Sequence, residues 1–265
     1  MAKVNEPRPA EMPFLDHLEE LRWRVLWSLL AVIVCSIAGY LLVQHMGVMQ
    51  LLIEPIQPFL NGGKLKYLSP TDPFFLTLKL ALTTGLVLAS PIVIYQIWAF
   101  LAPALMPSER RVIVPSLYLG VLLFIVGVVM AYELVLPMTL RFTMNFQTDF
   151  LEQNIVVGPY MSMVMRLLLG FGIVFELPVV ILILSAMGLV TPQFLASKRR
   201  HAIVGITALA SILTPGDVIT VTVMMMLPLV LLYELSIVLA RIFEPKGPSR
   251  WRMFDGDDDD ANDLD

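Results

Sequence analysis

The sequence predicts an all-α membrane protein with six transmembrane helices, and three observations support this fold class. The mean hydropathy is +0.78, 57% of the 265 residues are hydrophobic and only 15% are charged. A soluble domain of this length carries more polar surface than this composition provides. Long stretches contain almost no charge, and most Lys and Arg residues lie in short clusters between them. Helices that cross a hydrocarbon core of about 30 Å show this alternation.

The predicted spans are 25–43, 74–100, 112–136, 159–187, 202–213 and 218–240. Thr71 and Asp72 are candidate caps for the second span, and Pro73 suits its first turn. Pro137 is expected to end the third span. The last apolar region is too long for one span, and Thr214-Pro215-Gly216-Asp217 is a strong turn signal that divides it into two helices.

The predicted fifth span is too short for a bilayer. Residues 202–213 reach only about 18 Å at 1.5 Å per residue. Either the helix begins earlier, with residues 198–201 at the interface, or the bilayer thins around it. Short fifth and sixth helices beside full-length ones predict a lopsided bundle.

The distribution of basic residues predicts the orientation. With six spans, both tails and the second and fourth loops share one side of the membrane. The five basic residues in the opposite loops or near that face are Lys64, Lys66, Lys79, Arg141 and Arg166, which leaves 13 of 18 on the first side. The positive-inside rule therefore places both termini in the cytoplasm.

The two ends of the chain differ in character. Residues 1–24 form a cytoplasmic N-terminus with an amphipathic helix, expected to lie at the membrane interface. His17 in this helix is expected to be exposed to solvent. Residues 241–265 form a cytoplasmic tail in which seven of the last eleven residues are aspartate, and this tail is expected to be disordered.

One ionisable residue lies deep in a predicted span. Glu176 stands near the middle of the fourth span, where a charged carboxylate costs about 2.5–3.5 kcal/mol on insertion scales. Pro178 frees the carbonyl of Val174 one turn back, which favours a wet, bendable point. Glu176 is either a protonated structural group or a functional one that carries protons or contacts a partner helix.

Glu20 and Glu109 are candidates for an acidic surface on the cytoplasmic face, suited to a cationic peptide because carboxylates accept bidentate bonds from arginine. On composition alone, a helix start at Glu109 together with basic residues on the inner side is the favoured interpretation. The sequence contains no phosphate loop, nucleophile elbow or paired catalytic carboxylates, so it does not predict an enzyme. Three scattered histidines and one cysteine offer no metal-ligand spacing, and neither a cofactor nor a nucleic-acid partner is expected.

Motifs along nearly the whole chain resemble one family. They are His17-Leu-Glu-Glu-Leu-Arg22, Ser69-Pro-Thr-Asp-Pro-Phe-Phe75, Pro91-Ile-Val-Ile-Tyr-Gln-Ile-Trp-Ala-Phe-Leu-Ala-Pro-Ala-Leu105, Glu109-Arg-Arg111, Phe171-Gly-Ile-Val-Phe-Glu-Leu-Pro178, Lys198-Arg-Arg-His201 and Leu213-Thr-Pro-Gly-Asp217. Each motif is modest alone, but their order across six spans resembles the TatC subunit of the twin-arginine protein translocase.

The resemblance implies a concave six-helix bundle in a bacterial plasma membrane. It implies that the chain recognises twin-arginine signal peptides and works with single-span TatA/TatB-type subunits in an oligomeric complex. Export of folded proteins would then use the proton-motive force. The implied signal-peptide-binding residues are Glu20, Glu109, Arg22, Phe100, Pro103, Arg110 and Arg111. The implied intramembrane polar or partner-contact residues are Glu176, Thr214 and Asp217.

Two other functions share the predicted topology. A proton-coupled small-solute transporter would use Glu176 as its coupling group, and a non-transporting membrane scaffold would use all charges structurally. Only the motif resemblance separates both from a translocase subunit.

Overall fold

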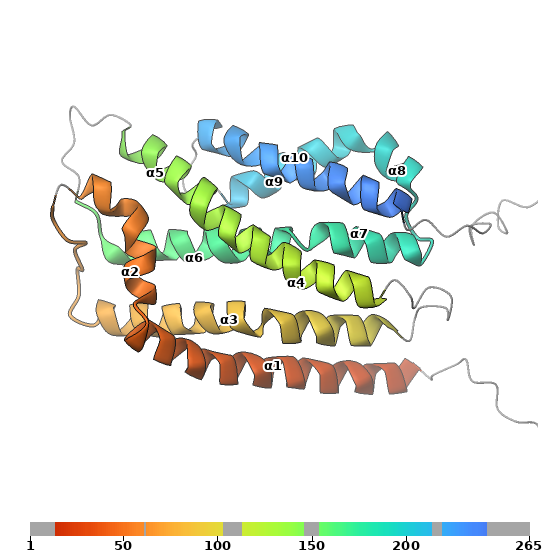
Figure 1. The fold of residues 1–265 in the computed structure, drawn as a ribbon, viewed down its shortest axis with the longest axis horizontal. Helices are drawn as coiled ribbons and strands as arrows, with labels where there is room; N and C mark the ends of the chain where they lie inside the picture. Colours follow the sequence, from red (N-terminus) through yellow and green to blue (C-terminus); the bar gives the residue numbers. More distant parts are fainter. Residues whose placement is uncertain (1–13, 61, 103–112, 146–153, 214–218, 243–265) are drawn as a thin grey trace, which may run out of the picture.

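The structure is a computed structural model that describes residues 14–60, 62–102, 113–145, 154–213 and 219–242 (Figure 1). Every named element is helical. In chain order the helices are α1 (Phe14–His45), α2 (Val48–Ile53), the 3-10 helix η1 (Glu54–Phe59), α3 (Asp72–Leu101), α4 (Ile113–Met130), the π-helical turn η4 (Ala131–Val135), α5 (Leu136–Met144), α6 (Val157–Val174), α7 (Leu177–Ala186), α8 (Pro192–Ser197), α9 (Arg199–Leu213) and α10 (Ile219–Ile242).

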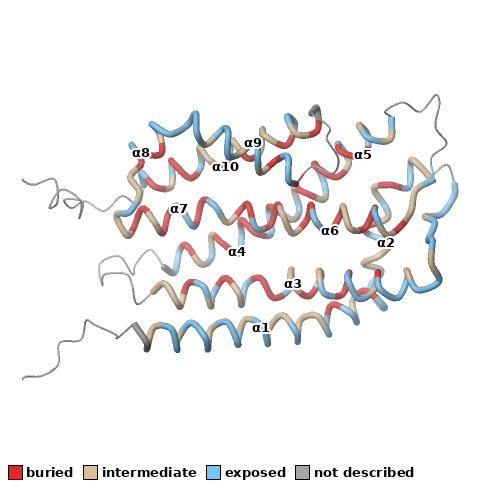
Figure 2. The backbone as a smooth tube through the Cα atoms, turned by 180° about the vertical axis from the view of Figure 1, so that it is seen from behind, coloured by how far each residue is buried: buried red, intermediate tan, exposed pale blue. Residues whose placement is uncertain are grey.

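Five continuous or nearly continuous helical segments in the described part are long and apolar enough to cross a membrane. They are His17–His45, Asp72–Leu101, Val114–Met144, Val157–Ala186 and Val221–Ile242. The last of these has 22 residues, so the expectation that the sixth helix is short is wrong. The fourth of these lies at the centre of the bundle, whereas α1 lies at its edge against α3 (Figures 1 and 2). The prediction of an all-helical membrane protein is therefore confirmed for at least five membrane-length helices.

Helix α1 runs without interruption from Phe14 to His45. It therefore contains both the predicted amphipathic segment and the predicted first span in one helix. Its outer surface is apolar and exposed, with Trp27 at 55% and Ile37 at 63% exposure. Such a face is compatible with lipid as its surroundings, because lipid tails are as apolar as these side chains.

The prediction that Pro137 ends the third span is wrong. The helix continues through α5 to Met144, because Pro137 follows a π-helical turn. The amide of Leu136 donates to the carbonyl of Ala131, five residues back. Because of this wider turn, Pro137 lies in the first turn of a new α-helical stretch, where the N–H that proline lacks would have no helical partner.

The predicted fourth span is divided into two helices at Glu176, its candidate functional residue. Helix α6 ends at Val174 and α7 begins at Leu177, so Phe175 and Glu176 form the break between them. The amide of Glu176 donates to the carbonyl of Ile173 at 3.1 Å, a tightened three-residue turn. Pro178 in the first turn of α7 cannot donate a backbone hydrogen bond, which accounts for the break.

Helix α3 begins at Asp72, as the sequence predicted within two residues, but its capping differs. Thr71 is the N-cap residue and its side chain makes no capping hydrogen bond. The Asp72 carboxylate instead accepts from the backbone amides of Leu68 and Ser69, at 3.0 and 2.9 Å. Asp72 therefore orders the preceding turn rather than the helix.

Glycines bring α1 and α3 into close backbone contact. A Cβ placed on Gly39 would lie 2.5 Å from the carbonyl oxygen of Ala81 and 2.9 Å from the amide nitrogen of Gly85. A Cβ on Gly85 would overlap the backbone of Ser36. No GxxxG pair announces this contact in the sequence, since the two glycines lie on different helices. The pair fixes the distance between the helices that carry the first candidate site.

Helix α9 begins at Arg199, which favours the earlier start proposed for the short fifth span. Arg199 makes a bidentate ion pair with Glu234 of α10, with Nε–Oε1 and Nη2–Oε2 distances of 2.9 Å. Both side chains are about half exposed, so the pair adds a small increment that aligns α9 with α10.

Candidate functional site

The first candidate site lies where the start of α1 meets the end of α3, at one end of the bundle (Figure 1). Glu20 on α1 accepts two hydrogen bonds on Oε1, from Nε of Arg24 at 2.9 Å and from its Nη2 at 2.5 Å. Arg24 also donates from Nη1 to the side-chain oxygen of Gln96 on α3, at 3.4 Å. Glu20 and Arg24 lie on the same face of α1 because they are four residues apart.

Aromatic stacking joins the same two helices. The ring of His17 on α1 stacks on that of Phe100 on α3, with a centroid separation of 4.4 Å and an interplanar angle of 15°. Nδ1 of His17 lies 3.8 Å from Oε2 of Glu20. His17 keeps 37% of its side chain exposed, so the expected exposure holds in part, but the ring also packs between Phe100 and Glu20.

The second carboxylate oxygen of Glu20, Oε2, is the acceptor of this cluster that still lacks a hydrogen-bond donor within the described residues. Oε2 is buried and makes no hydrogen bond within the described part of the chain. A carboxylate has about four lone-pair positions, and Arg24 uses only those on Oε1. The geometry therefore leaves an acceptor for a further cation or N–H donor beside His17, whose ring stacks on Phe100.

The structure brings together two of the predicted signal-peptide-binding residues, Glu20 and Phe100, through His17. Arg22 is exposed and has no hydrogen bond or ion pair with the described residues. The remaining predicted residues of this group lie outside the described residues: Pro103, Glu109, Arg110 and Arg111.

The second candidate site is the break between α6 and α7. Glu176 reaches Gly120 of α4, where an added Cβ would lie 3.0 Å from Oε2 and 3.4 Å from Cγ2 of Ile94. Its Oε1 is buried without a hydrogen-bond partner among the described residues. A glycine on the neighbouring helix thus makes room for the carboxyl group, which is suited to meet a donor from outside the chain. Thr214 and Asp217, predicted to act with it, lie outside the described residues.

Sequence reasoning missed His17, Arg24 and Gln96. The signal for the first two was present, because His17, Glu20 and Arg24 follow the i, i+3 and i+7 spacing of one helix face. The partnership of α1 with the last turns of α3 had no such signal, since it depends on how two apolar helices pack. No group of three or more metal-ligating side chains occurs within the ranges that the structure describes.

Comparison with known proteins identifies the family. The family described as Sec-independent protein translocase protein (TatC) matches residues 16–228. The TatC protein of Carboxydothermus hydrogenoformans is 36% identical over 89% of this chain and 95% of its own length. The TatC protein of Escherichia coli K12 is 35% identical over 90% of this chain and 92% of its own length.

A solved structure shares the fold. A crystal structure described as the twin arginine translocase receptor TatC aligns with a TM-score of 0.74 at 37% sequence identity, covering 86% of this chain and 99% of that one. The resemblance drawn from the motifs is therefore confirmed, and the small-solute transporter and the scaffold lose their support. The chain belongs to the TatC family, and it is the core subunit of a twin-arginine protein translocase rather than an enzyme.

Proposed function

We propose that this chain recognises twin-arginine signal peptides at the end of the bundle that carries Glu20 and Phe100. The observation that carries the proposal is the Oε2 atom of Glu20, which is buried beside His17 without a hydrogen bond in the described part of the chain. A guanidinium group satisfies such an oxygen with a charge-assisted bond, about twice as strong as a neutral one. Phe100, stacked on His17, extends the proposed surface with an aromatic ring that a cation can contact.

The two arginines of a twin-arginine signal peptide require two carboxylate acceptors on the proposed surface. Glu109 follows α3 closely in sequence and supplies the second carboxylate of the proposed surface, and Arg22, Pro103, Arg110 and Arg111 support it. Arg24 already occupies Oε1 of Glu20, so an incoming arginine either shares the carboxylate through Oε2 or displaces Arg24. The surface therefore favours arginine, whose guanidinium group is a planar, multiple donor, over lysine, whose ammonium group is only a point charge.

We propose six membrane crossings with both termini in the cytoplasm of a bacterial cell. The N-terminal end of α1 and the C-terminal end of α10 lie at the same side of the bundle (Figure 1), which supports an even number of crossings. Five helices have membrane length, and the 15-residue α9 supplies the sixth crossing beside α10. A short α9 thins one side of the bundle and favours the concave shape. The excess of basic residues on this side points it toward the cytoplasm.

We further propose that Glu176, Thr214 and Asp217 contact single-span TatA/TatB-type subunits in an oligomeric complex driven by the proton-motive force. The support is the unpartnered Oε1 atom of Glu176, since a polar side chain from a partner helix would complete its hydrogen bonding within the membrane. Glu176→Ala should preserve folding and reduce export of a folded cargo.

Photo-crosslinking tests the recognition surface. A twin-arginine signal peptide with a photoreactive residue beside the arginine pair is incubated with membranes that contain the chain. We expect Glu20→Gln to reduce crosslinking strongly, and Glu19→Gln to leave it unchanged, because Glu19 is exposed and outside the cluster. Equal crosslinking in both variants, at equal protein levels, would contradict the proposed surface.

A further inference from the structure

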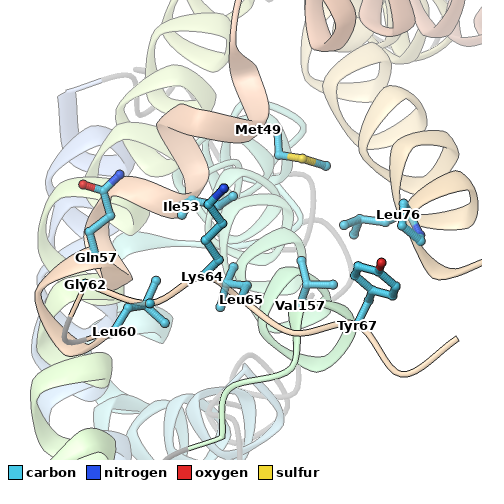
Figure 3. Close-up of a pocket in the computed structure, with 12 residues that line it drawn as sticks. Met49, Ile53, Gln57, Leu60, Gly62, Lys64, Leu65, Tyr67, Leu76 and Val157 are labelled. Carbon is cyan, nitrogen blue, oxygen red and sulfur yellow. The ribbon is translucent and has the colours of Figure 1, made fainter. Parts of the chain in front are cut away.

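A pocket of about 550 Å³ lies at the end of the bundle opposite to the Glu20 cluster (Figures 1 and 3). Its walls come from α2, η1, the loop that follows them, and the first turns of α3 and α6. Its apolar lining residues include Met49, Ile53, Leu60, Leu65, Leu76 and Val157. The loop is held in place by backbone hydrogen bonds of Lys66 with Ile155 and Val157, at 3.0 and 2.8 Å.

The pocket lies at the boundary between hydrocarbon and headgroups. Pro73 and Leu76 belong to the first turns of α3, and Val157 is the first residue of α6. Both helices begin membrane-length segments, and the first turn of such a segment lies where the hydrocarbon core ends. Tyr67, 60% exposed, lines the pocket at this level, as expected of the aromatic belt.

Lys64 is the only ionisable group other than the Tyr67 phenol among the residues that line the pocket. It has no ion pair or hydrogen bond with the described residues, unlike Lys66, whose Nζ donates to the side chain of Asn154. The carboxylate of Asp72 is already held by two backbone amides. In Figure 3, Lys64 and Tyr67 rise from the loop beside apolar side chains of α2 and α3. The pocket therefore combines an apolar interior with one unpaired cation.

The volume of the pocket favours a small apolar ligand over a peptide helix. One turn of an α-helix with its side chains fills roughly 400 Å³, given a 5.4 Å pitch and a diameter of about 10 Å. A peptide helix would place little more than one turn in 550 Å³. The volume instead falls in the range of about 300–1,000 Å³ typical of sites for one small molecule.

We propose that this pocket binds one acyl chain of an anionic phospholipid, with the phosphate of the same lipid on Lys64. The lipid is drawn from the leaflet at this end of the bundle, so it reaches the apolar walls without crossing water. Lys64 distinguishes anionic from zwitterionic lipids, because a lysine near a membrane surface attracts anionic headgroups. The bound chain would wedge α2 against α3 and stiffen the loop between them.

Photolabelling in lipid nanodiscs tests the proposal with the full chain. The probes are phosphatidylglycerol and phosphatidylcholine that carry the same diazirine-bearing acyl chain. We expect phosphatidylglycerol to label peptides that contain Ile53, Leu65 or Leu76, and phosphatidylcholine to label them several-fold less. Lys64→Gln should lower phosphatidylglycerol labelling about five-fold, as expected for the loss of one lysine at a membrane surface. Lys66→Gln is the matched control, because Lys66 does not line the pocket, and it should retain full labelling.

Lys64 is exposed, so Lys64→Gln should fold normally, and unchanged elution from a size-exclusion column checks this. Ile53→Trp, which fills the pocket, should abolish labelling by both lipids at these peptides. Equal labelling of Lys64→Gln and Lys66→Gln would overturn the proposal, as would labelling confined to other helices. Equal labelling by a diazirine fatty acid, or by an apolar helical peptide, would also overturn it, because either result assigns the pocket to another ligand.

Discussion

The packing of α1 on α3 should control both stability and the geometry of the Glu20 cluster, and Gly85→Ala tests this. The added Cβ would lie 2.5 Å from the amide nitrogen of Ser36 and 2.6 Å from its Oγ, whereas ordinary contacts begin at 3.4 Å. The obstructing atoms are mainly backbone, so the helices must separate by roughly 1 Å to restore normal contact. We expect a destabilisation of about 1–3 kcal/mol, the usual cost of overpacking.

The same separation moves the two halves of the candidate site apart. His17 and Phe100 stack at a centroid distance of 4.4 Å, and a displacement of about 1 Å removes much of the dispersion energy of such a contact. Gly85→Ala should therefore lower thermal stability in detergent and weaken signal-peptide binding together. Gly39→Ala should act similarly, because its Cβ meets the carbonyl oxygen of Ala81 at 2.5 Å.

Gly205→Ala on α9 is the matched control, because no atom lies within 4 Å of its added Cβ. Alanine is favoured over glycine in a helix by up to about 1 kcal/mol, so this variant should be as stable as the unsubstituted chain or more so. If Gly85→Ala matched Gly205→Ala in stability and in peptide binding, the argument from helix separation would be refuted.

Three further outcomes follow from individual contacts. Arg24→Gln frees Oε1 of Glu20 and should raise the affinity for a twin-arginine peptide by about 1.4- to 5-fold, given pair energies of about 0.2–1 kcal/mol; a lower affinity in a titration would show that Arg24 positions the carboxylate instead. Gly120→Ala crowds Oε2 of Glu176 and should reduce export, and Glu176→Asp in the same chain, one methylene shorter, should restore it in part; no restoration contradicts the contact. Arg199→Gln breaks a half-exposed ion pair with α10 and should cost no more than about 1 kcal/mol in a denaturation experiment, so a larger loss would mean that the pair is better shielded than its exposure indicates.

The sequence predicted the membrane class and the positions of the long helices, because a bilayer imposes length and hydropathy on each segment independently. Pro137 was misread because proline ends a helix only when the turn before it keeps α-helical geometry, and the π-helical turn at Ala131–Val135 does not. The short helices α2 and α8 were not predicted. Six residues each carry too little periodicity for a helix signal.

The candidate site was predicted in its residues more than in its arrangement. Glu20 was proposed from its charge and supported by the motif resemblance, whereas Phe100 came from the resemblance alone; the structure brings them to one place through His17. The roles of Arg24 and Gln96 depend on which turn of α3 faces α1. Apolar residues surround both helices, so hydropathy does not select the contact face, and the Gly39–Gly85 contact that fixes it joins residues far apart in sequence.

A double-mutant cycle between the chain and its peptide tests the central claim most directly. The dissociation constants of peptides with Arg-Arg and with Gln-Gln are measured on the unsubstituted chain and on Glu20→Gln in nanodiscs. We predict a coupling free energy of about 1.5–3 kcal/mol, as for hydrogen bonds to charged groups. Glu20→Gln should therefore weaken the binding of the Arg-Arg peptide and leave the binding of the Gln-Gln peptide unchanged. An equal effect of Glu20→Gln on both peptides, or no effect on either, would contradict recognition of the arginine pair by Glu20.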